Sequence, residues 1–233
     1  MKIKKITPFF FPCVIILFSC AGQKKNVFIP VPVNNYFVTE KNNNNINPDN
    51  IIETKTGVSV RSLPGWLSSF INGGVEEVER MNAFYGKYIF IGSNEGVNFT
   101  AMNMWANNFS AVKDFTILAA ERIERRMISW AYSYPDYEYG LFFETMAKKA
   151  YSAVYTGAVK EDTYWIKMKV MQENDITEEY SEIYIFFVLI SINKMSLQAI
   201  ISNLMTESLS AVTPTKEQLD SINRMRRNFY ERF

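Results

Sequence analysis

The hydrophobic positions of the chain change their spacing several times, and each change marks an expected element. Residues 88–92 (Tyr-Ile-Phe-Ile-Gly) form a short apolar run typical of a strand that ends at a glycine. From about residue 98 to 133, apolar residues recur every three or four positions, which predicts one long helix. At about 1.5 Å per residue such a helix would be about 50 Å long, so we expect a break or bend within it.

The second half of the chain adds a further helix and a pair of strands. Tyr134-Pro135-Asp136 interrupts the helical pattern, and a helix is expected over about 139–156. Residues 163–170 and 184–192 are rich in aromatic and β-branched residues, which predicts two strands of an antiparallel hairpin. The second run is the more apolar of the two, so we expect it to be the more buried strand.

Two helices are expected after the hairpin. The first covers about 196–209, and Thr213-Pro214 opens the second, because proline fits the first helical position. We therefore predict the α+β class, with a small antiparallel sheet of three or more strands packed on one face by helices, including one long helix.

A polar stretch precedes this domain, which we expect to occupy residues 63–233 from Leu63-Pro64-Gly65-Trp66 onwards. Residues 41–50 are mostly asparagine, a residue that competes with helix formation and adds little to a core. We therefore interpret residues 20–62 as a flexible tether.

The first nineteen residues resemble a bacterial lipoprotein signal peptide. Three early lysines, Lys2, Lys4 and Lys5, precede an apolar run over 9–18, which is shorter than the about 20 residues that a membrane-spanning helix needs. Leu17-Phe18-Ser19-Cys20-Ala21 resembles a lipobox, although Phe18 is bulkier than usual. The expected lipidation site is Cys20. The alternatives are an ordinary cleaved signal or an uncleaved anchor with an incidental cysteine.

Cleavage before Cys20 would change the chemistry of the exported chain. It would remove Cys13 and three lysines, so the formal charge would fall from +1 to −2 and no free thiol would remain. By resemblance to the enteric sorting rule, Ala21 in place of aspartate permits transfer to the outer membrane. The resulting expectation is a membrane contact made through the lipid on Cys20 rather than through a basic patch.

The composition of the 233 residues excludes several classes of function. The chain has no histidine, so histidine triads, histidine general bases and histidine-ligated zinc or haem are unavailable. Lys+Arg 25 against Asp+Glu 24 argues against nucleic-acid binding by bulk charge. We expect no catalytic residues, no metal and no cofactor.

Two short motifs match sequences found in known enzymes. Ser110-Ala111-Val112-Lys113 matches the S-x-x-K of penicillin-binding proteins, and Lys55-Thr56-Gly57 spells their K-T-G. In those enzymes K-T-G lies downstream of the serine, whereas here it lies upstream, so a packed helix turn is the preferred interpretation. Residues 92–96 (Gly-Ser-Asn-Glu-Gly) lack the ending of a phosphate loop and are expected to connect a strand to a helix.

Charged and aromatic residues give weaker indications. Acidic groups at 76–79 and 178–182 are expected on solvated faces, and Glu121 and Arg125 form an i,i+4 pair. A composite basic surface could join the last helix to the long one, through Arg122, Arg125, Arg126, Arg224, Arg226, Arg227 and Arg232. A ligand groove could instead use exposed aromatics, among which we single out Trp66, Trp105, Tyr164 and Trp165.

The order of these motifs resembles the Lpp-twenty-like family of bacterial lipoproteins, typified by the twenty-kilodalton Helicobacter lipoprotein. The resemblance rests on Pro64-Gly65-Trp66, the 88–92 strand, Ala119-Ala120-Glu121-Arg122 and the two later strands. It implies contacts with other proteins of the envelope and transfers no catalytic residue. Trp105, Phe109 and Phe115 depart from the small residues that the family often has there.

Three functions follow as hypotheses. The first is a lipid-anchored, non-enzymatic interaction or structural module of the outer membrane, with an envelope protein as its unknown partner. The second is a lipoprotein that binds a small apolar or sugar ligand through aromatic residues. The third is an enzyme built only from carboxylate, lysine, tyrosine or serine groups, which would need convergent polar groups in a cleft.

Overall fold

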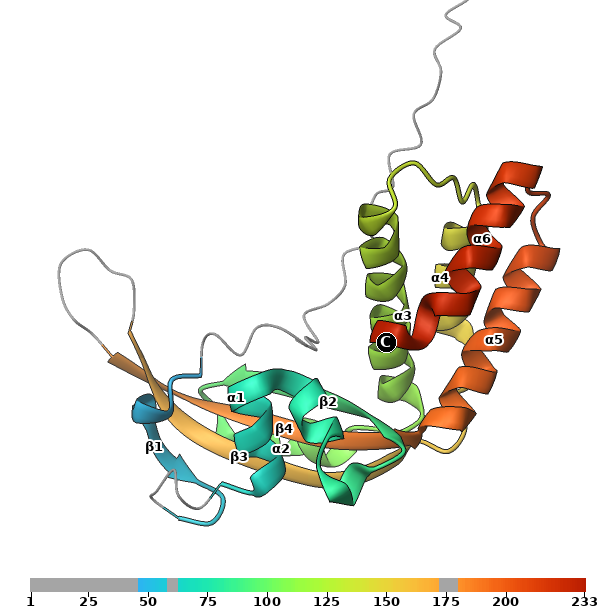
Figure 1. Cartoon of the computed structure of the whole chain (residues 1–233). Helices are drawn as coiled ribbons and strands as arrows, with labels where there is room; N and C mark the ends of the chain where they lie inside the picture. The colour runs from blue at the N-terminus through green and yellow to red at the C-terminus, as the bar shows by residue number, and fades with distance from the viewer. Residues whose placement is uncertain (1–45, 58–62, 172–179) are drawn as a thin grey trace, which may run out of the picture. The chain divides into compact units, whose positions relative to one another are not determined.

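The computed structural model describes residues 46–57, 63–171 and 180–233, and within them the chain forms a four-stranded antiparallel sheet with six α-helices (Figure 1). The strands lie in the order β1-β3-β4-β2. Their bounds are β1 Ile51–Thr54, β2 Lys87–Gly96, β3 Val159–Met171 and β4 Tyr180–Asn193. The helices are α1 Gly65–Glu79, α2 Phe99–Asn108, α3 Lys113–Ser133, α4 Phe142–Ser152, α5 Lys194–Ser210 and α6 Lys216–Asn228. The predicted α+β class is confirmed.

The expected antiparallel hairpin is the centre of the sheet and is longer than its sequence pattern indicated. β3 pairs with β4 from Val159 opposite Ser191 to Met171 opposite Tyr180, with an irregularity between Lys160 and Asp162. All of β2 pairs with the other side of β4, from Lys87 opposite Asn193 to Gly96 opposite Tyr184.

The fourth strand lies inside the stretch that we expected to be a tether. β1 pairs antiparallel with β3, placing Thr54 opposite Ile166, and both Ile51 and Thr54 are buried. The interpretation of residues 20–62 as a flexible spacer is therefore wrong for residues 51–54. Residues 1–45 and 58–62 lie outside the described part of the chain, and with them Cys20 and the predicted signal peptide.

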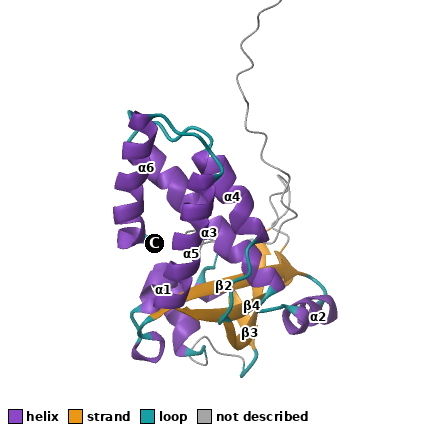
Figure 2. Cartoon of the chain, turned by 90° about the vertical axis from the view of Figure 1, so that its right-hand side faces the viewer, coloured by secondary structure: helices purple, strands orange, loops and turns teal. Residues whose placement is uncertain are grey.

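Alternating residues of β4 point into two separate hydrophobic cores. Phe186, Val188 and Ile190 belong to one core, and Phe187 and Leu189 belong to the other. α1 covers the second core with Trp66, Leu67, Phe70, Val75 and Val78. The remaining helices contribute to the first, and Figure 2 shows α3 to α6 grouped beside the strands. Helices therefore cover both faces of the sheet, not one as expected, which explains the unbroken apolar run of β4.

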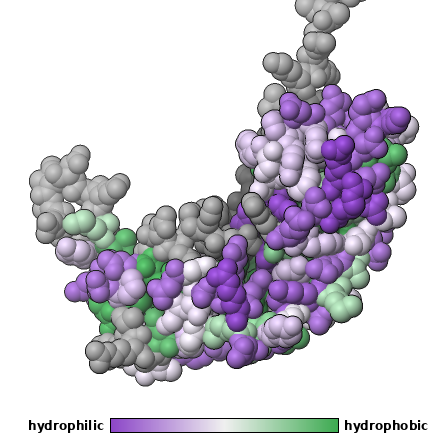
Figure 3. All heavy atoms as spheres, viewed as in Figure 1, coloured by the Kyte–Doolittle hydropathy of each residue, from purple (hydrophilic) through white to green (hydrophobic). Residues whose placement is uncertain are grey.

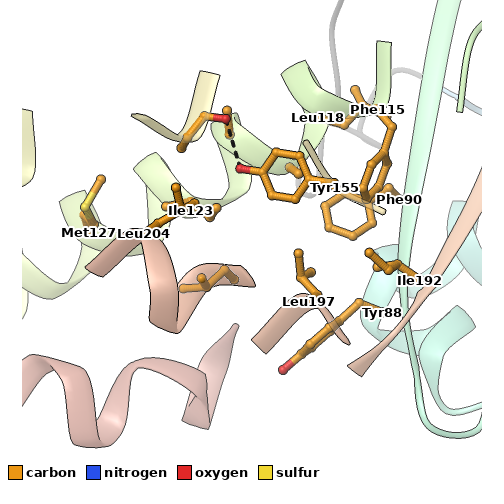
Figure 4. Packing of buried hydrophobic residues seen from close by; sticks show 14 of the residues in the cluster. Tyr88, Phe90, Phe115, Leu118, Ile123, Met127, Tyr155, Ile192, Leu197 and Leu204 are labelled. Carbon is orange, nitrogen blue, oxygen red and sulfur yellow. Dashed lines mark hydrogen bonds between the residues drawn. The ribbon is translucent and has the colours of Figure 1, made fainter. Parts of the chain in front are cut away.

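Aromatic contacts join the sheet to the helices in the first core (Figure 4). The Phe90 ring of β2 meets Phe115 of α3 edge-on at 4.8 Å between centroids, and Phe115 meets Tyr155 in the same way at 5.8 Å. The Tyr155 hydroxyl donates to the carbonyl of Ala150, so this buried phenol is satisfied. The helix expected to run to residue 156 ends at Ser152, which frees Tyr155 to fold back onto it.

The long helix expected over 98–133 is two helices with a break at residues 109–112. The backbone of Phe109 leaves the helical region, and Ser110 then accepts the N–H groups of Val112 and Lys113 through its Oγ. The Ser110 N–H in turn donates to the Asp114 carboxylate at 2.7 Å. The break therefore has its own hydrogen-bond cap, built from polar side chains rather than glycine or proline.

The last helix starts two residues later than the proline signal indicated, at Lys216. Thr215 and Gln218 form a reciprocal capping box at the start of α6, so Pro214 precedes the cap and is not the first helical residue. Asn193 caps α5 by accepting the N–H groups of Met195 and Ser196. Among the described residues, none of the helices combines the length and hydropathy that crossing a membrane requires.

Candidate functional site

The two motifs that match penicillin-binding proteins serve structural roles in different places. Ser110 caps the break before α3, and Val112 is largely exposed rather than packed as expected. Lys55 donates through Nζ to the carbonyl of Thr163, and the Thr56 hydroxyl bonds the Tyr164 hydroxyl at 2.7 Å. The K-T-G triplet thus ties β1 to β3.

The glycine-containing stretch at 92–96 is part of β2 and not a connecting loop. Gly92 sits in the strand because the Phe109 ring lies where its Cβ would be, with a ring carbon 2.8 Å from that position. The helix that follows is capped by Asn98, whose side chain accepts the Ala101 N–H. Gly92 therefore allows the close approach of the Phe109 ring to the β2 backbone and does not belong to a phosphate loop.

One arginine of the expected basic surface is buried instead. Arg122 is 4% exposed and pairs with Glu79 at 3.1 Å. The same guanidinium donates to the carbonyl of Ile89, and the Glu79 carboxylate accepts the Ile89 N–H. The rings of Tyr88, Phe90 and Phe233 surround the guanidinium at about 5 Å. This pair joins α1, β2 and α3 and cannot contribute to a surface patch.

A second polar cluster spans three strands. Glu161 of β3 accepts hydrogen bonds from Lys87 of β2 and Ser191 of β4. Those two bonds, the one from Lys87 first, hold the pKa of the Glu161 carboxyl below its usual range. The Ser191 hydroxyl is buried and donates its proton to this carboxylate, so the cluster links β2, β3 and β4 in a fixed register.

Two other acidic side chains form ion pairs at the surface. Glu77 pairs with Arg80 on the exposed side of α1, and Glu182 pairs with Lys167 across the hairpin. Glu178 and Glu179 lie outside the described residues. Burial raises the pKa of the Glu121 carboxyl, and Arg125 opposes that rise. Within the described ranges, no group of three potential metal ligands is present.

The four aromatic residues singled out for a ligand groove do not share a cavity. Trp66 is buried in the second core and donates to Asp162 at 2.9 Å. Tyr164 belongs to the same core. Trp105 packs on Phe109, while Trp165 packs on Phe99 in the first core. These side chains fill space, and the aromatic groove expected from them is wrong.

A different set of residues lines an open cavity of about 330 Å³ near the end of α3. Trp130 comes from the last turns of α3, Tyr134 ends that helix, and Tyr137 follows in a turn closed by a bond from its N–H to the Tyr134 carbonyl. The opposite wall is the last part of α6. The six lining residues are Trp130, Tyr134, Tyr137, Arg224, Arg227 and Asn228.

The aromatic wall of this cavity is a series of rings packed against one another. Trp130 lies against Tyr134 at 4.4 Å, and Tyr134 stacks on Tyr137 at 5.2 Å with an interplanar angle of 12°. Arg126 lies over Trp130 at one end of the series. Arg224 lies over Tyr137 at the other end and donates to its hydroxyl at 3.0 Å.

Neighbouring residues hold this wall in place. Arg126 donates to the carbonyls of Asn228 and Phe229, which holds the end of α6 against α3. Tyr139 stacks on Phe143 at 4.2 Å, and burial raises the pKa of Tyr139 to about 12, with the neighbouring Trp130 indole opposing that rise. Tyr139 therefore stays neutral at physiological pH.

Sequence reasoning noticed some of these residues without connecting them. Arg224 and Arg227 were considered only as part of a basic surface, and Tyr134 only as an interruption. Trp130 and Tyr134 stand four residues apart, a spacing that brings side chains together at a helix end, and that was the available signal.

No family model, no curated protein and no solved structure matches this chain. The resemblance to the Lpp-twenty-like family therefore stays a prediction.

Proposed function

We propose that the chain is a lipid-anchored protein of the bacterial outer membrane, held by Cys20, that acts without catalysis through contact with another envelope protein. The lipobox-like sequence supports the anchor, and the folded part supports the contact. No cofactor, metal or nucleic acid enters this proposal.

The observation that carries the protein contact is an arm formed by the ends of β3 and β4. β1 reaches β3 only as far as Met168, and β2 reaches β4 only as far as Tyr184. Among the described residues, 169–171 and 180–182 therefore pair only with each other (Figure 1). A two-stranded ribbon is marginally stable alone, and its free edges can pair with another chain.

The arm also exposes apolar side chains. Val170, Met171 and Tyr180 are 37%, 56% and 57% exposed, and Met171 lies directly opposite Tyr180. Figure 3 shows hydrophobic atoms beside the grey end of this arm, whereas much of the helical part is hydrophilic. Exposed apolar groups gathered at a free edge favour a protein partner.

Site-specific photocrosslinking in cells tests this contact. A photoreactive phenylalanine replaces Tyr180 in the full chain, and the matched control replaces Tyr132, which is 83% exposed on α3. We expect discrete adducts with an envelope protein from position 180, lost when Met171→Glu is added. Adducts of equal strength from both positions, or none from position 180, would contradict the proposed contact.

The alternative hypothesis, a lipoprotein that binds a small apolar or sugar ligand, loses the residues first assigned to it. Sugar rings stack on open aromatic faces, and the rings that line the cavity already pack on one another. We therefore prefer the protein-contact function.

A further inference from the structure

We propose that the cavity lined by Trp130, Tyr134, Tyr137, Arg224, Arg227 and Asn228 is a binding site for a phosphomonoester group carried on a small organic body. This inference concerns elements other than the arm, and either proposal can fail without the other.

The charge of the lining residues is the first argument. Two of the six are arginines, and none is acidic. Neither Arg224 nor Arg227 forms an ion pair with any residue that the structure describes. The exposed Arg227 guanidinium makes no hydrogen bond within the same ranges, so its donors remain open to solvent. Two guanidinium groups without a carboxylate partner match a dianion, and a phosphomonoester carries about −1.5 to −2 charge at pH 7.

The aromatic wall is the second argument. In the series Trp130, Tyr134 and Tyr137, the first two rings pack at a tilt of 36° and the last two are stacked, and the guanidinium groups of Arg126 and Arg224 cover the ends. Ring faces carry the negative part of the aromatic quadrupole and ring edges carry the positive part. Because the faces are occupied by neighbours, we infer that edges and hydroxyl groups are what the wall offers to a ligand, and these favour an anion.

The position of Arg224 is the third argument. It is held over Tyr137 by its hydrogen bond to the phenol oxygen, which fixes the guanidinium at the cavity wall. A guanidinium that is already oriented loses less conformational freedom on binding than a free one. Asn228 adds a neutral amide donor, and its backbone carbonyl is held by Arg126.

The size of the cavity sets the size of the ligand. About 330 Å³ is at the lower end of the range for small-molecule sites, and it exceeds what a phosphate group alone would fill. A phosphate with a sugar-sized body fits this volume. The phosphomonoester could belong to a soluble sugar phosphate or to a lipid headgroup, which share this chemistry.

Titration calorimetry on the full chain with Cys20→Ser tests the site, with glucose 6-phosphate as the probe and glucose and inorganic phosphate as comparisons. We expect glucose 6-phosphate to bind most tightly, inorganic phosphate more weakly, and glucose not at all. The affinity should fall as sodium chloride is raised, because the contact is ionic.

Matched variants locate the binding. Arg224→Gln with Arg227→Gln should weaken glucose 6-phosphate binding by at least about tenfold, since each removes a charge-assisted contact. The control pair Arg226→Gln with Lys216→Gln removes the same charge from α6 outside the cavity, because Arg226 bonds Thr206 instead. It should leave affinity within about twofold. Arg224→Lys with Arg227→Lys keeps the charge and should recover part of the affinity.

Vesicles distinguish the two sources of the phosphomonoester. Sedimentation with phosphatidic acid vesicles but not phosphatidylcholine vesicles, lost in the double glutamine variant, would support a lipid headgroup. Binding of glucose 6-phosphate without vesicle sedimentation would support a soluble ligand. The proposal is overturned if glucose binds as well as its phosphate, if neither probe binds, or if the two double glutamine variants bind alike.

Discussion

The ion pair between Arg122 and Glu79 should be worth far more than a surface pair, because it completes the hydrogen bonding of an edge strand. β2 lies at the edge of the sheet, and Ile89 bonds to these two side chains in place of a further strand. The N–H of Ile89 lies 2.9 Å from the Glu79 carboxylate, and its carbonyl lies 3.0 Å from the Arg122 guanidinium.

The perturbation is Arg122→Met, which removes the cation and keeps much of the side-chain volume. Both partners are nearly inaccessible, with side chains 5% and 11% exposed, so Glu79 would be left as a buried, unpaired carboxylate. Breaking a buried pair in this way costs about 3–5 kcal/mol of unfolding free energy. The lost donor to the Ile89 carbonyl accounts for about 1–3 kcal/mol of the penalty.

A double variant separates the cost of an unpaired buried charge from the cost of unbonded backbone groups at the edge strand. Replacing a buried pair by apolar residues is often neutral, because both desolvation penalties disappear. Here Arg122→Met with Glu79→Leu would leave the N–H and the carbonyl of Ile89 without partners, so a loss of about 2 kcal/mol or more should remain. The control Arg80→Met breaks the exposed pair with Glu77 and should cost no more than about 1 kcal/mol.

Urea unfolding followed by far-UV circular dichroism measures these differences. A cost below about 1 kcal/mol for Arg122→Met would refute the reasoning about the buried charge. Full recovery of stability in the double variant would refute the role of the pair at the strand edge.

Three further predictions concern single positions. Gly92→Ala should lower the unfolding free energy by about 1–3 kcal/mol because the new methyl group meets the Phe109 ring, and Phe109→Leu should relieve that loss in thermal denaturation. Thr215→Ala should cost about 1 kcal/mol in urea unfolding by removing the N-cap of α6. The pKa of Glu161 is lowered in the folded protein, mainly by the hydrogen bond from Lys87. The ionised carboxylate therefore stabilises the fold at pH values above the ordinary carboxyl pKa, and this stabilisation is lost as the pH falls through the folded-state pKa. Glu161→Gln should therefore reduce stability at neutral pH and flatten its decline below about pH 4, and an unchanged acid titration would contradict this.

The parts of the fold that follow from local pattern could be predicted. The β3–β4 hairpin and the helices after it were expected because their hydrophobic periods are long and regular. The break between α2 and α3 has no glycine or proline to mark it. Its position depends on the Asp114 carboxylate accepting the Ser110 N–H and on the Ser110 hydroxyl accepting the Lys113 N–H, which the sequence pattern does not show.

β1 was missed because four residues beside an asparagine-rich tract carry almost no pattern of their own. Only pairing with β3 makes Ile51 and Thr54 buried, and that pairing joins segments more than a hundred residues apart. The two-sided core had a visible signal, since an apolar run without alternation in β4 is typical of a strand covered on both faces.

The cavity could not be predicted for the same reason. Trp130 and Tyr134 are close in sequence, but Arg224 and Arg227 reach them only because α6 packs against α3 through Arg126. The sequence of the last helix contains several basic residues. Only the packing of α6 against its neighbours places Arg224 over the Tyr137 ring and directs Arg226 to Thr206.

The intact mass of the protein extracted from membranes, beside a Cys20→Ser form, tests the proposed anchor most directly. We expect a chain that begins at Cys20, carries the added mass of a diacylglyceryl group and partitions into detergent, whereas the serine form should show none of these three properties. A wild-type chain cleaved elsewhere, or one with no added mass at Cys20, would contradict it.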